Sequence, residues 1–66
     1  MNAMDRKILM LRKGITQAEI ARRLGVSGAT VSLVVSGRMR SRRVEQAIAE
    51  TLGLPREILW PDRRGR

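Results

Sequence analysis

The stretch Thr16–Ser36, TQAEIARRLGVSGATVSLVVS, decides the fold of this chain. It begins with a Thr-x-x-Glu pattern, in which the Thr16 hydroxyl caps the Glu19 N–H and the Glu19 carboxylate reaches back to the start of a helix. Gly25 ends that helix, because the left-handed backbone conformation is least costly for glycine. Ser27 offers an N-cap for the next helix. The pattern predicts two helices joined by a short turn, near 17–24 and 28–35.

The second of these helices is predicted although its composition favours a strand. Residues 30–35, TVSLVV, are rich in β-branched side chains and partly alternate, so propensity alone favours a strand. The chain has no second strand-like run to pair with it, and a lone strand would leave its backbone groups without partners. We therefore expect a helix that is stabilised by packing and not by intrinsic propensity.

Helical signals also flank the central stretch. Met4, Ile8 and Leu11 recur at helical spacing and predict an amphipathic helix whose apolar face they form. Ser41 is a candidate N-cap for a fourth helix, which Gly53 ends. The apolar stripe of this fourth helix is formed by Val44, Ile48 and Leu52.

Trp60, the one aromatic residue of the chain, follows a short last helix that Pro55 begins. We expect Trp60 in the core beside Ile48 and Ile58, with a protein interface as the alternative. The expected fold is all-α and compact, with a single domain over 1–61 and a basic, disordered tail over 62–66. Its five helices are expected near 3–13, 17–24, 28–35, 42–52 and 56–60.

Composition restricts the classes of function. Fourteen basic residues against six acidic ones give a net charge of +8. Such a charge fits a polyanionic partner, with nucleic acid ahead of an anionic membrane. Without Cys or His, disulfides and the commonest zinc ligands are excluded, and the acidic residues are scattered among arginines. We expect no enzyme, no cofactor and no metal, and a cytoplasmic location, because no signal peptide or bilayer-spanning run is evident.

Residues 17–36 resemble the helix-turn-helix of the lambda repressor and Cro superfamily. The resemblance is carried by three positions of the motif core: a small residue between the helices, a glycine at the turn, and an apolar residue ten positions beyond the first. These are Ala21, Gly25 and Val31. Segments 45–49 and 55–61, which end in Trp60-Pro61, further resemble the phage Ner-like regulators.

The resemblance implies that the third helix lies in the major groove of DNA, with its N-terminal residues at the base edges. The implied base-contacting residues are Ser27, Gly28, Ala29, Thr30, Ser32 and Leu33. Gly28 and Ala29 can offer no side-chain hydrogen bond, so this helix is expected to make few direct hydrogen bonds to bases. The implied phosphate-contacting residues are Gln17, Arg38, Arg40, Arg42 and Arg43.

The expected function is sequence-specific binding of double-stranded DNA by a transcriptional regulator, a repressor of phage or bacterial type that acts alone or as a homodimer. No membrane or small-molecule partner is evident. Two alternatives remain open at this point. One is the antitoxin of a toxin–antitoxin pair, although a basic tail does not favour it, and the other is a non-specific polycation that binds RNA, bulk DNA or anionic lipid.

Overall fold

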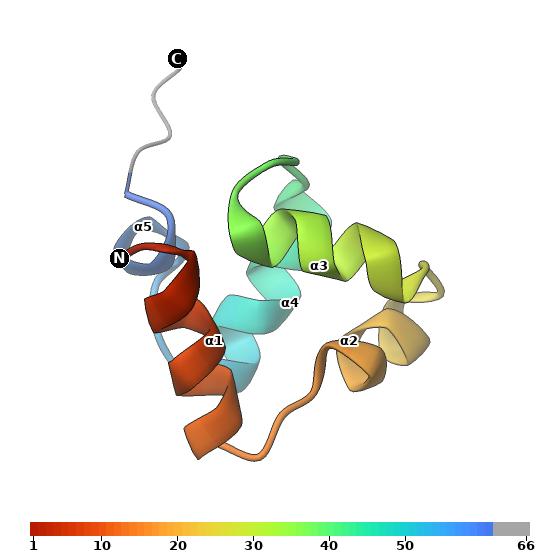
Figure 1. The fold of residues 1–66 in the computed structure, drawn as a ribbon, viewed down its shortest axis with the longest axis horizontal. Coiled ribbons are helices and arrows are strands. Elements are labelled where there is room, and N and C mark those ends of the chain that lie inside the picture. The colour runs from red at the N-terminus through yellow and green to blue at the C-terminus, as the bar shows by residue number, and fades with distance from the viewer. Residues whose placement is uncertain (62–66) are drawn as a thin grey trace.

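A computed structural model describes residues 1–61, and within them the chain forms five α-helices and no strand (Figure 1). The predicted all-α class is confirmed, and each helix boundary lies within one residue of its prediction. Residues 30–35 are helical, so the strand alternative is wrong. The predicted disordered tail, 62–66, lies outside the described residues. The helices are α1 (Ala3–Arg12), α2 (Gln17–Leu24), α3 (Gly28–Ser36), α4 (Arg42–Leu52) and α5 (Arg56–Leu59).

Side-chain caps begin the three central helices, as the sequence predicts. The Thr16 hydroxyl accepts a hydrogen bond from the Glu19 N–H at 3.1 Å, and a Glu19 carboxylate oxygen accepts one from the Thr16 N–H at 3.0 Å. The Ser27 and Ser41 hydroxyls cap α3 and α4 by accepting from the backbone N–H groups of Thr30 and Val44, without a returning carboxylate. Each cap satisfies a backbone N–H that the helix itself leaves without a partner. The helix boundaries are therefore set by local chemistry.

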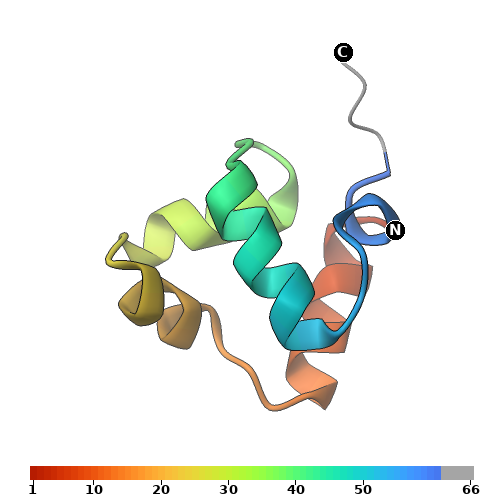
Figure 2. The ribbon, with the colours of Figure 1, turned by 180° about the vertical axis from the view of Figure 1, so that it is seen from behind.

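Helix α3 lies at the centre of the fold and contacts α1, α2 and α4. Its inner face is formed by Val31, Val34 and Val35, all completely buried. In Figure 1, α3 crosses in front of α4, with α1 and α2 beneath it on either side. Figure 2 shows from behind that α5 lies beside the first turn of α1. A helix with poor intrinsic propensity is thus stabilised by packing on three sides.

Helix α1 buries the face opposite to the one expected, and here the sequence prediction is wrong. Met4, Ile8 and Leu11 are 63%, 43% and 78% exposed, whereas Arg6 and Met10 are 5% and 3% exposed. The helix carries a second apolar arc that includes Met10, and the Arg6 guanidinium finds backbone carbonyls to bond on that side. Tertiary hydrogen bonds, which helical periodicity does not reveal, therefore determine which face of α1 is buried.

Trp60 is buried in the core, which confirms its predicted position. Its companion Ile48 is also buried, but Ile58 is 50% exposed, so that part of the prediction is wrong. Because α5 has a single helical turn, only one of its sides faces the core, and Leu59 lies on that side.

Among the described helices, none is long and apolar enough to span a membrane.

Candidate nucleic-acid interface

The outward face of α3 is made mostly of small side chains. Gly28, Ala29, Ser32 and Leu33 are exposed on the side opposite to the buried valines. Positions four apart on a helix share a face, so Gly28 lies in line with Ser32, and Ala29 lies in line with Leu33. The four residues form one continuous surface along the helix, which brings together most of the predicted base-contacting residues. We call this surface the α3 face.

The three hydroxyl groups predicted to contact bases differ in their surroundings. The Ser27 and Thr30 hydroxyls lie 2.9 Å apart and share a hydrogen bond, and the Ser27 oxygen also accepts from the Thr30 N–H. Both are therefore engaged in capping the helix. Within residues 1–61, the exposed Ser32 hydroxyl has no hydrogen bond. Of the three, the Ser32 hydroxyl is the one most available to an external partner.

Two predicted phosphate-binding arginines lie in the loop after α3. The backbone N–H groups of Arg38 and Met39 both donate to the carbonyl of Leu33, at 2.9 and 3.2 Å. This folds the loop back against the end of α3, and it leaves Arg38 and Arg40 exposed. Arg42, the first residue of α4, is exposed as well. The loop thus adds positive charge at the C-terminal end of the α3 face.

Arg43 lies at the opposite end of the α3 face. Its guanidinium donates to the carbonyl of Leu24 at 2.8 Å, which places it at the α2–α3 turn. A cation at the C-terminus of α2 is also favoured by the helix dipole. The other predicted phosphate-contacting residue, Gln17, is half-buried at the first position of α2. The predicted phosphate contacts therefore do not form one cluster, and arginines lie at both ends of α3.

The C-terminal end of α3 is held by Arg6, a residue whose role the sequence analysis missed. The Arg6 guanidinium donates to the carbonyl of Val35 at 2.7 Å and to the carbonyl of Leu59 at 2.6 Å. It also lies over the Trp60 ring, 5.2 Å from the ring centre. Burial lowers the pKa of this guanidinium, and the nearby carboxylates of Glu45 and Asp5 oppose that shift. An arginine nevertheless stays protonated in a protein.

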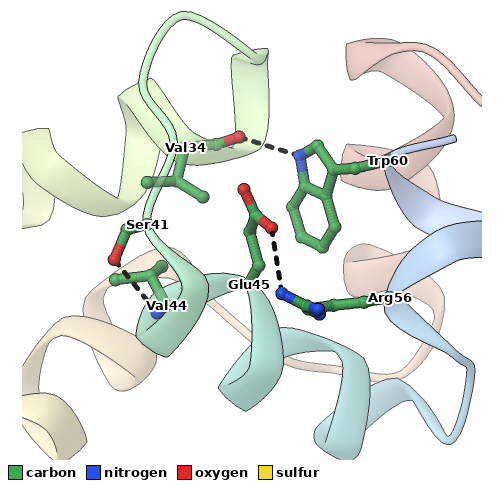
Figure 3. A network of polar contacts seen from close by, with 6 residues as sticks. All are labelled: Val34, Ser41, Val44, Glu45, Arg56 and Trp60. Atoms are coloured by element: carbon green, nitrogen blue, oxygen red, sulfur yellow. Dashed lines mark hydrogen bonds and ion pairs between the residues drawn. The ribbon is translucent and has the colours of Figure 1, made fainter. Parts of the chain in front are cut away.

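Trp60 contributes a second bond to the same helix end. Its indole Nε1–H donates to the carbonyl of Val34 at 3.1 Å (Figure 3). The last carbonyls of a helix have no partner within the helix, so two of them in α3 are satisfied by side chains from α1 and from the segment after α5. We call Arg6 and Trp60 the clamp. Because both side chains are buried, the clamp fixes where α3 ends relative to α1 and α5.

Glu45 lies beside the clamp as a buried acid. It is 1% exposed, and its carboxylate pairs with the Arg56 guanidinium at 3.7 Å (Figure 3). A cavity of about 180 Å³ separates this region from the loop after α3. The cavity is lined by Arg6, Gly37, Met39, Arg40, Glu45, Trp60 and Pro61. The clamp is therefore directly behind the arginine-bearing loop.

No local pattern identifies Arg6 and Glu45 as buried. Each is a charged residue on an amphipathic helix, a setting in which solvent exposure is the rule. The partners of Arg6 lie 29 and 53 residues away in the chain. One indirect signal exists: a lone Trp in an arginine-rich chain is a natural partner for a cation–π contact.

A family model described as "winged helix-turn-helix DNA-binding" matches residues 3–64. No curated protein and no solved structure matches the chain. The matched range contains α2, the turn at Gly25 and α3, the two helices of the motif with the exposed α3 face. Within residues 1–61 no strand is present, so the described elements do not include a β-hairpin wing.

Proposed function

This chain belongs to the winged helix-turn-helix DNA-binding family, and we propose that it regulates transcription by placing the α3 face in the major groove of a specific DNA site. DNA binding follows from membership of the family. The finer proposal concerns how the chain binds: Ser32, Ala29 and Leu33 contact base edges, while arginines at both ends of α3 contact phosphates.

The single observation that carries this proposal is the exposure of the α3 face between arginines. A helix that enters the major groove must present a face that the rest of its domain does not cover, and the side chains on that face must reach the bases. The α3 face meets this condition, with the unbonded Ser32 hydroxyl at its middle. Ala29 is suited to contact a thymine methyl group, and Ser32 can donate to or accept from several bases.

Within this family we infer a repressor of the lambda and Ner type. Five short helices, with no strand among residues 1–61, support this kind of domain more than one that binds DNA through a wing. Small residues on the α3 face leave few base-specific hydrogen bonds. Part of the specificity is then expected to come from DNA shape and from an arginine at the loop.

The test begins with selection of bound duplexes from a random pool. The selected duplex and a scrambled duplex of equal composition are then titrated at one fixed salt concentration. We expect the selected duplex to bind at least about 100-fold more tightly, because specific and non-specific affinities of such proteins commonly differ by about 10³ or more. Equal binding to both duplexes would contradict the proposal and would leave a non-specific polycation.

Arg38→Ala provides the control for charge. If Arg38 contacts a phosphate, this variant should weaken binding to both duplexes by a similar factor. It should also flatten the slope of log K against log salt by about one. Lys7→Ala is the matched variant, because it removes one exposed positive charge on α1, away from the α3 face. It should leave the slope nearly unchanged, and an equal change in both variants would contradict the assigned interface.

A further inference from the structure

The outward face of α1 carries an apolar stripe that residues 1–61 leave uncovered. It consists of Met4, Ile8 and Leu11, which are 63%, 43% and 78% exposed. Four other large apolar residues of this range are exposed. Leu33 and Met39 lie on the α3 face or its loop, where DNA is proposed to cover them, whereas Met1 precedes α1 and Ile58 lies on α5. The α1 stripe is on another helix, so DNA bound at the α3 face does not account for it.

The spacing of the stripe is that of a helix–helix seam. Steps of four and three residues place Met4, Ile8 and Leu11 at successive d, a and d positions of a heptad. Arg6 then occupies the f position, opposite the seam, and it is buried within its own domain. Helix α1 is therefore attached to the domain by one face and presents a seam on the other.

The charges beside the stripe distinguish between two ways of pairing it with a second copy. Asp5 and Arg12 occupy e positions on one flank and Lys7 the g position on the other, and all three are exposed. In a parallel pair, g faces the next e of the partner, which sets Lys7 against Arg12. In an antiparallel pair, e faces e, which sets Asp5 against Arg12 twice, and g faces g, which sets Lys7 against Lys7 once, so attractive pairs outnumber the repulsive one. The pattern favours the antiparallel pair, because e and g charges determine helix orientation.

We propose that α1 docks with α1 of a second copy, antiparallel about a two-fold axis close to Ile8. Met4 of one copy then packs towards Leu11 of the other, and Asp5 pairs with Arg12 at each end. The interface is isologous, so both copies contribute the same surface. On the basis of the proposed function, such a pair would present two α3 faces to a site with two-fold symmetry.

The size of the stripe indicates a weak dimer. A stable interface buries about 800 Å² on each partner, and three side chains from a ten-residue helix cover less than that. Dimer formation is therefore expected to depend on concentration and to be reversed by dilution. On DNA, a first bound copy would raise the effective concentration of the second, so the weak contact would appear as cooperative binding.

The test is sedimentation equilibrium of the full chain without DNA, over a wide range of concentrations. Wild type should shift from monomer to dimer as concentration rises. Leu11→Glu should weaken the dimer by at least about tenfold, because a charge would be desolvated in the seam. Ile58→Glu is the matched control: it places the same charge at a half-exposed apolar residue of α5 and should leave the dimer unchanged.

A charge exchange tests the orientation of the pair. Asp5→Arg and Arg12→Asp should each weaken the dimer, and the double variant should restore it. The Asp5 carboxylate also caps the Asn2 N–H, but Asp5→Arg and the double variant lose that cap equally, so comparing them isolates the contact between copies. Circular dichroism confirms that each variant is folded.

Three outcomes would overturn the proposal. These are a wild type that stays monomeric at every concentration, a dimer that Leu11→Glu leaves intact, or an equal loss in Ile58→Glu. A double variant no better than Asp5→Arg would overturn the antiparallel arrangement. Because no DNA is present, any of these failures leaves the proposed function untouched, and failure of the DNA titrations leaves the dimer test valid.

Discussion

The two ends of α3 are built in different ways. At its C-terminal end, buried side chains from other parts of the chain bond to the carbonyls of Val34 and Val35. At its N-terminal end, within residues 1–61, the side-chain hydrogen bonds are local and join Ser27 to Thr30. One end is held by the domain and the other is left open to a partner. The comparison supports the proposal that positioning the helix and contacting bases are separated along its length.

The largest effect is expected from removing the positioning end. Arg6→Met keeps the length of the side chain but leaves the carbonyls of Val35 and Leu59 without their side-chain donor. Because each unsatisfied buried group costs about 1–3 kcal/mol, the free energy of unfolding should fall by about 3 kcal/mol. Urea denaturation followed by circular dichroism measures this change.

Arg6→Lys is the control for Arg6→Met. It keeps the positive charge but replaces the planar fork of donors, so it should recover only part of the lost stability. Unfolding of Arg6→Met at the wild-type urea concentration would show that the clamp does not hold α3.

A smaller loss is expected where α2 and α3 pack beneath the open end. Ala21 is 6% exposed, and α2, the helix that carries it, packs against α3. Ala21→Leu should lower stability by about 1–3 kcal/mol through overpacking. Ala18→Leu, at an exposed position of the same helix, should have little effect. If neither variant differs from wild type in melting temperature, the assignment of Ala21 to the motif core is wrong.

A still smaller loss of stability is expected from alanine substitutions at two glycines that end helices. Gly25 and Gly37 both have a positive φ, 73° and 87°, so alanine at either position should cost about 1–2 kcal/mol. An added Cβ at Gly37 would lie 3.3 Å from the Arg6 Nη2, whereas at Gly25 it would meet nothing within 4 Å. Gly37→Ala should therefore lower the melting temperature more than Gly25→Ala. The reverse order would contradict the close packing of the clamp against the loop.

Local signals account for the helices that the sequence predicted correctly. The hydroxyl caps of Thr16, Ser27 and Ser41, with glycines at the helix ends, involve residues three or four apart, so they are visible in the sequence. Even the helical state of residues 30–35 could be inferred, because a lone strand has no partner. The α3 face and its arginines, by contrast, were expected from the resemblance of residues 17–36 to the lambda repressor and Cro superfamily.

What the sequence did not predict depends on contacts between distant residues. Two apolar arcs run along α1, and helical periodicity cannot tell which of them turns inward. The choice is made by Arg6, whose acceptors come from α3 and α5. Arg43 gives a second example, at the interface. It was predicted to contact phosphate, but its guanidinium also donates to the Leu24 carbonyl, a contact between distant residues that the sequence does not reveal. Its contact with phosphate remains a prediction.

Base contact by the α3 face is tested most directly by scanning the selected duplex, one base pair at a time, with three proteins. For wild type, each important base pair should cost about 1–3 kcal/mol when changed. Ser32→Ala should flatten this profile at one base pair and leave the rest, because only its own contact is lost. Arg38→Ala should lower every affinity alike and keep the profile. An unchanged profile in Ser32→Ala, with a change in Arg38→Ala, would contradict base contact by the α3 face.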